Sequence, residues 1–128
     1  MARSMVLITA LVGVALLVSG CATNTPSQER YTNVSNTWRG SEHPAVLMLF
    51  DQSDMATQEG NWSAALTYLD QARRIEPRNP HVIYRQAKVL VLAGDNARAK
   101  QLLDRARVLA GDEDDSLNAL VAELELKL

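Results

Sequence analysis

Residues 60–75 of this chain read Gly60-Asn61-Trp62-Ser63-Ala64-Ala65-Leu66-Thr67-Tyr68-Leu69-Asp70-Gln71-Ala72-Arg73-Arg74-Ile75. A second stretch reads Gly94-Asp95-Asn96-Ala97-Arg98-Ala99-Lys100-Gln101-Leu102-Leu103-Asp104-Arg105-Ala106-Arg107-Val108-Leu109. The two stretches align at a constant offset of 34 residues, and the residues that recur include Gly60, Ala65, Leu69, Asp70 and Ala72. A constant offset of this size indicates a repeated helical unit.

The recurring residue types of the two stretches suit the ends and the contacts of packed helices. Gly60 and Gly94 suit the left-handed backbone position that ends a helix, where other residues are strained. Asn61 and Asp95 follow directly and predict N-caps for the next helices. Small side chains that would let two helices approach closely recur at Ala65, Ala72, Ala99 and Ala106. Larger apolar side chains that would fill the space between helices are Leu69, Ile75, Leu103 and Leu109.

This pattern resembles the tetratricopeptide repeat (TPR) family over residues 44–128. The resemblance implies an all-α fold, a short TPR-like solenoid of two helical hairpins plus a C-terminal capping helix. The expected helices cover residues 44–59, 62–75, 80–93, 96–110 and 116–128. Pro77 is expected to stop one helix, and Asn79 followed by Pro80 predicts the start of the next. The last helix is expected to bury one apolar stripe, made of Leu117, Leu120, Val121, Leu124 and Leu128.

Some positions depart from the usual pattern of that family. Leu49 and Ile83 stand where the family often has a large aromatic residue, and Gly111 stands where the second repeat would end in proline. Solenoids of this kind usually need three or more repeats for stability. An additional helix, a partner chain or self-association is therefore expected to cover an open end.

The N-terminal residues have the features of a secretory signal. Arg3 is followed by a nearly apolar run over residues 5–18 and then by two small residues, Ser19 and Gly20. The run is shorter than the roughly 20 residues that a membrane-spanning helix requires. Residues 17–21 resemble the lipobox of bacterial lipoproteins, which implies cleavage before Cys21 and a covalent lipid on this single cysteine. No other cofactor is expected.

Composition then divides the chain into three parts. We expect a lipoprotein signal peptide at residues 1–20, the lipidated cysteine with a Ser-, Thr- and Asn-rich flexible tether at 21–43, and the TPR-like domain at 44–128. Ala22 rather than Asp follows the cysteine, and by the resemblance this implies a lipid-anchored protein at the outer membrane, facing the periplasm. Tyr31 and Trp38 in the tether either dock onto the domain or a partner, or they are incidental exposed aromatics or pack against the first helix.

The chain offers little for other classes of function. A net charge of −2 and a pI near 5.6 give no basic surplus for nucleic acid. His43 and His81 lack a recognisable arrangement of acids or nucleophiles, so no catalytic residue and no enzyme activity are expected. The acidic run at residues 112–115 lacks the ligand spacing of a calcium loop and is interpreted as a solvated linker that favours the start of the last helix. No metal site is predicted.

The TPR resemblance implies that the first helices of the hairpins line a concave surface that binds a protein partner. Carried onto this chain, the partner-binding residues are Leu47, Phe50, Asp54, His81, Tyr84 and Lys88. Phe50 and Tyr84 would be exposed aromatic anchors; the alternative is that Phe50 and Leu47 pack against the tether or a neighbouring helix.

The function expected from these features is a membrane-anchored adaptor. It would bind another cell-envelope protein or peptide in envelope, pilus, secretion or cell-wall assembly. The alternative is a structural subunit of an envelope complex that stacks through its repeat edges.

Overall fold

The computed structural model describes residues 39–128. It contains helices α1 (Pro44–Gln58), α2 (Trp62–Ile75), α3 (Pro80–Leu92), α4 (Asn96–Ala110) and α5 (Asp115–Glu125). These bounds lie within three residues of the expected ones, and no strand occurs in the described part. The predicted all-α, TPR-like architecture is therefore confirmed. None of the helices in residues 39–128 is long and apolar enough to cross a membrane.

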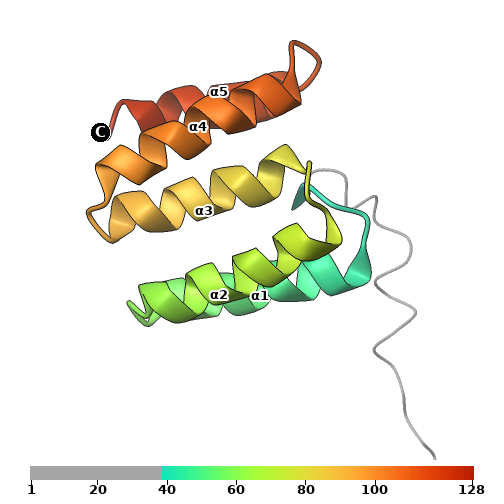
Figure 1. Cartoon of the computed structure of the whole chain (residues 1–128), viewed down its shortest axis with the longest axis vertical. Coiled ribbons are helices and arrows are strands. Elements are labelled where there is room, and N and C mark those ends of the chain that lie inside the picture. The colour runs from blue at the N-terminus through green and yellow to red at the C-terminus, as the bar shows by residue number, and fades with distance from the viewer. Residues whose placement is uncertain (1–38) are drawn as a thin grey trace, which may run out of the picture.

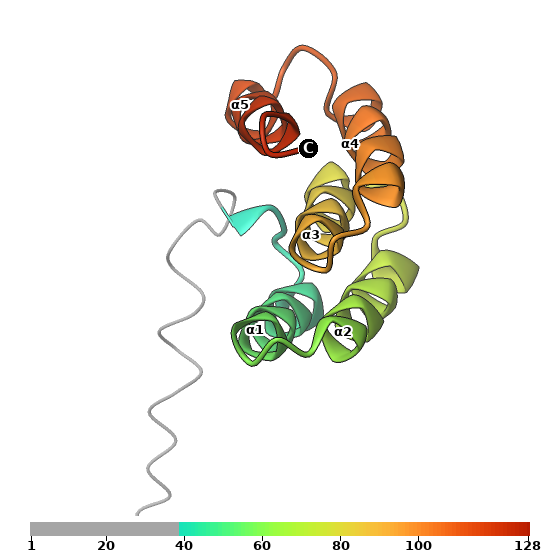
Figure 2. The same ribbon diagram turned by 90° about the vertical axis from the view of Figure 1, so that its left-hand side faces the viewer.

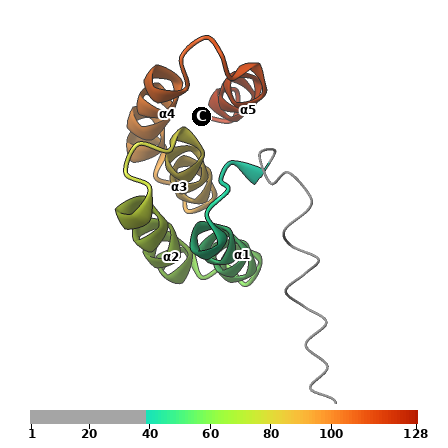
Figure 3. The same ribbon diagram turned by 90° about the vertical axis from the view of Figure 1, so that its right-hand side faces the viewer.

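The helices form two antiparallel hairpins followed by the single helix α5. Figure 1 shows the hairpins α1–α2 and α3–α4 stacked along the long axis, with α5 beside α4. Seen along the helices, α1, α3 and α5 follow one side of the stack and α2 and α4 the other (Figures 2 and 3). The side formed by α1, α3 and α5 is concave, as expected for stacked helical hairpins.

The residues at the helix ends explain why the hairpins form where they do. Gly60 and Gly94 have φ of +72° and +83°, so both take the left-handed conformation predicted for them. The side chain of Asn61 accepts a hydrogen bond from the backbone N–H of Ala64 at 3.1 Å, and Asp95 caps α4 in the same way. The predicted glycine ends and N-caps are confirmed at both hairpin turns.

The core divides into two clusters on the two sides of α3. Between α1, α2 and α3 the cluster is Val46, Leu47, Phe50, Ala56, Ala65, Leu69, Ala72, Val82 and Val89. Between α3, α4 and α5 it is Ile83, Ala87, Leu103, Ala106, Leu117, Val121 and Leu124. The four alanines shared by the repeat, Ala65, Ala72, Ala99 and Ala106, are all fully buried. This burial agrees with the expectation that small side chains occupy the contacts between helices.

Some of the expected apolar positions are exposed instead. Ile75 is 40% exposed because it is the last residue of α2. Leu120 is 42% exposed, since α5 buries the side that carries Leu117, Val121 and Leu124. Leu128 is also exposed, because α5 ends at Glu125. The predicted stripe of the last helix was therefore too wide and too long.

The domain also includes residues that the sequence had assigned to the tether. Arg39 forms an ion pair with Asp51, and Ser41 is 8% exposed, so the segment just before α1 rests on the helices. His43 is the N-cap of α1. Composition alone did not reveal this packing, because the segment contacts residues far along the chain. The expectations for residues 1–38, including the lipidated Cys21, Tyr31 and Trp38, lie outside the described residues.

Candidate ligand-binding face

A hollow of about 360 Å³ lies between α1 and α3. Its lining residues come from the C-terminal half of α1 and from the middle and C-terminal part of α3: Ser53, Asp54, Thr57, Gln58, Arg85, Lys88 and Val89. Six of these seven residues are polar or charged. The hollow is therefore suited to a polar segment with an apolar contact at Val89, and not to a purely apolar ligand.

Arg85 organises the charges of this hollow. Its Nη1 lies 3.1 Å from each carboxylate oxygen of Asp54, which ties α3 to α1. Its guanidinium also lies over the ring of Phe50, 4.3 Å from the ring centroid. Both contacts hold the Arg85 side chain in place, so the guanidinium forms a fixed wall of the hollow.

Lys88 is the second cation in the hollow, one turn beyond Arg85 on α3. Its side chain is exposed, and no carboxylate of the described residues lies within 4 Å of its ammonium. In contrast to Arg85, this ammonium donates to no side chain of residues 39–128, so its donors face an incoming group. Lys88 therefore gives the hollow one positive charge that an acidic ligand group can neutralise.

Two of the six predicted partner-binding residues are core residues instead. Phe50 is fully buried and Leu47 is 5% exposed, both in the cluster between α1, α2 and α3. Phe50 lies four residues after Val46 and three before Ser53, and these spacings place the three on one side of α1, which is buried. The expectation that Phe50 is an exposed anchor was wrong, and the alternative that Phe50 and Leu47 pack against a neighbouring helix is confirmed.

His81 and Tyr84 are also engaged within the domain. Nε2 of His81 lies 2.9 Å from Oδ2 of Asp114, the N-cap residue of α5. Tyr84 packs against the cluster between α3, α4 and α5, and burial together with the nearby carboxylate of Glu123 raises the pKa of its hydroxyl. Tyr84 is thus partly covered, and it is not the free anchor that was expected.

The remaining two predicted residues, Asp54 and Lys88, both line the hollow between α1 and α3. Sequence reasoning missed Arg85, which is paired with Asp54 and lines the same hollow. The signal was present, because Arg85 is four residues after His81 and three before Lys88 and so shares one helix side with both. Choosing the neighbouring Tyr84 shifted the predicted surface by one residue, or about 100° around the helix.

The other candidates for chemistry have structural roles. Nδ1 of His43 accepts a hydrogen bond from the backbone N–H of Ala45 at 3.2 Å, which caps α1. Asp114, from the acidic run, caps α5 through the backbone N–H of Leu117 at 2.9 Å, as the linker interpretation predicted. Within residues 39–128 there is no group of three side chains arranged to hold a metal ion.

Comparison with known proteins gives one family. A model described as tetratricopeptide repeat matches residues 56–124, more than half of the chain. The match starts in the last turn of α1 and ends within α5. Neither the curated proteins nor the solved structures that were searched gave a match. The 34-residue repeat, the stacked hairpins and this match agree, and the chain belongs to the tetratricopeptide repeat family, whose repeats mediate protein–protein interaction and are usually non-enzymatic.

Proposed function

We propose that this protein is a lipid-anchored adaptor of the bacterial outer membrane that binds another cell-envelope protein. Two independent features support the proposal. Residues 17–21 resemble a lipobox with Cys21 as the lipidated residue, and the alanine that follows it fits outer-membrane delivery. The repeat family and the concave side of the domain supply the binding function. The anchor would hold the adaptor on the periplasmic face of the membrane.

The observation that carries the binding role is the hollow between α1 and α3. Lys88 offers an exposed ammonium there, beside the Arg85 guanidinium that is held by Asp54. The side chains of Thr57 and Gln58 also line the hollow, and the Thr57 hydroxyl, which donates to the carbonyl of Ser53 at 2.8 Å, remains able to accept a hydrogen bond. A segment of a partner protein with an acidic side chain for Lys88 and polar groups for the rim would fit this chemistry.

A structural subunit that stacks through its repeat edges is the second candidate. Leucines on and after α5 are exposed at the end of the stack, at Leu120, Leu126 and Leu128. The molecular mass in solution, measured over a range of protein concentrations, separates the two functions. A mass that rises with concentration favours stacking, and a constant monomer mass favours the adaptor.

The proposed binding surface is tested by crosslinking in intact cells followed by purification of the protein. The variant Lys88→Ala removes the open cation of the hollow, and Lys100→Ala is the matched control, since it removes an exposed lysine from α4 on the other side of the stack. We expect the wild type and Lys100→Ala to capture the same envelope protein and Lys88→Ala to lose it. Equal capture by all three would contradict the assignment of this hollow.

A further inference from the structure

Residues 39–41, here called the strap, lie on the concave side of the stack, between α1 and α5 (Figures 2 and 3). Their contacts reach the loop between α2 and α3. The carbonyl oxygen of Gly40 accepts a hydrogen bond from Nδ2 of Asn79 at 2.6 Å, and Oγ of Ser41 donates to Glu76 at 3.0 Å. Nδ2 of Asn79 also donates to Glu76, at 2.6 Å. The strap is therefore held by a connected set of polar groups.

Gly40 fits against the ring of His81 in a way that only glycine permits. Its φ is +88°, in the left-handed region, and the residue is buried. A methyl group at this position would overlap the His81 ring, far inside van der Waals contact. The backbone of Gly40 is therefore packed directly against the imidazole of His81, with no room for either to move closer to the other.

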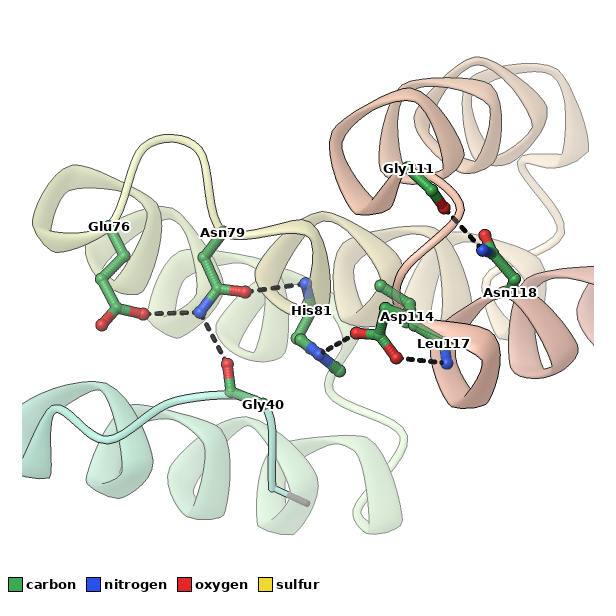
Figure 4. A network of polar contacts seen from close by, with 8 residues as sticks. All are labelled: Gly40, Glu76, Asn79, His81, Gly111, Asp114, Leu117 and Asn118. Carbon is green, nitrogen blue, oxygen red and sulfur yellow. Dashed lines mark hydrogen bonds and ion pairs between the residues drawn. The ribbon is translucent and has the colours of Figure 1, made fainter. Parts of the chain in front are cut away.

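The contacts continue from His81 to the start of α5 (Figure 4). Nε2 of His81 lies 2.9 Å from Oδ2 of Asp114, while Oδ1 of Asp114 accepts from the backbone N–H of Leu117 at 2.9 Å. The backbone N–H of His81 donates to Asn79 at 2.8 Å, the same residue that holds the strap. The strap, the start of α3 and the N-cap of α5 thus form one continuous network.

We propose that the strap is a latch that couples the chain preceding the domain to the position of α5. If the strap leaves, the His81 ring loses the backbone packed against it, and its bond to Asp114 is no longer held in place. Asp114 is the cap of α5, so the first turn of that helix loosens with it. A force or a binding event on the preceding chain would then change the α5 wall of the concave side. This coupling is independent of which partner the hollow binds.

Hydrogen exchange of the full-length protein, followed by mass spectrometry, tests the latch. The variant Gly40→Ala strains the backbone and places a methyl group on the His81 ring. Gly94→Ala is the matched control, because Gly94 has a similar φ of +83° but open space around its Cβ position. We expect Gly40→Ala to speed exchange in the first turns of α5 by about tenfold, a coupling of ~1.4 kcal/mol, and Gly94→Ala to leave α5 unchanged.

A second pair of variants tests the route through His81. Asp114→Asn keeps a side-chain oxygen to cap α5 but replaces the oxygen that faces Nε2 of His81, so α5 should exchange faster by a similar factor. In a His81→Ala background the latch is already broken, and adding Gly40→Ala should have no further effect on α5. An additive effect of the two changes would overturn the proposal, because the coupling would then not pass through the imidazole.

A milder variant keeps the test decisive if Gly40→Ala fails to fold. Ser41→Ala removes the strap's bond to Glu76 and the bond that Oγ of Ser41 accepts from the backbone N–H of His43, and it leaves Gly40 and the His81 ring unchanged. Faster exchange at α5 in this variant, together with faster exchange at the strap, supports the latch. Faster exchange at the strap with no change at α5 refutes it, since the strap would then open alone.

Discussion

The substitution Phe50→Ala distinguishes a core residue from a surface anchor. Phe50 is the largest of the fully buried side chains, and it packs among residues of α1, α2 and α3. Its removal leaves a cavity at the junction of three helices and also removes the ring beneath the Arg85 guanidinium. Buried Phe→Ala changes typically lower the free energy of unfolding by about 3–5 kcal/mol.

This loss is large for a domain of the present size. Small domains have a total free energy of unfolding of roughly 5–15 kcal/mol, and in such domains ~1 kcal/mol shifts Tm by about 4–8 °C. We therefore expect Phe50→Ala to lower Tm by at least about 12 °C, measured by circular dichroism at 222 nm as the temperature is raised. Phe50→Leu, which keeps most of the apolar volume, should lie between the wild type and Phe50→Ala.

Met48→Ala is the matched control on the same helix. Met48 is 63% exposed on the opposite side of α1, so its removal should change the free energy of unfolding by no more than about 0.5 kcal/mol. If Phe50→Ala melts within ~3 °C of the wild type, as Met48→Ala should, then Phe50 is not a core residue. The assignment of α1's buried side would be refuted with it.

Three further predictions test other parts of the chain. Ala106→Leu should overpack the fully buried contact between α3 and α4 and lower the free energy of unfolding by about 1–3 kcal/mol in a urea titration; an unchanged midpoint would mean that the helix sides are misplaced. The hydrogen bond from Arg98 lowers the pKa of Asp95 below its ordinary value of 3.8, so the charge of Asp95 stabilises the fold above pH 3.8 and ceases to do so as the pH falls through the lowered pKa. The Tm advantage of the wild type over Asp95→Asn should therefore shrink below pH 3.8, and an advantage that grows there would contradict the assignment. Cys21→Ser should abolish labelling with palmitate and release the protein from the membrane fraction. Full labelling together with retention in the membrane fraction would refute the lipoprotein proposal.

The helices and their ends were predictable because their signals are local. Asn61 bonds to a backbone N–H three residues away, and Gly60 needs only its own φ. The buried alanines were found because the second hairpin repeats the first at the same offset. The candidate site was harder to predict, since the residues that reach the concave side depend on how each helix is rotated against its neighbours. The exposure of Phe50 and Tyr84 was misjudged for this reason, whereas Asp54 and Lys88 both line the hollow between α1 and α3.

By itself, then, the sequence determined the all-α repeat, the helix bounds and the capping residues, because these depend on residues a few positions apart. Only the tertiary structure decided that Arg85 of α3 contacts both Asp54 and Phe50 of α1. It also decided that the residues expected to end the tether are a strap on the domain. Gly40 and Asn79 are 39 residues apart, and His81 and Asp114 are 33 apart. Contacts at such separations depend on how the hairpins pack, so no local pattern of residues could predict them.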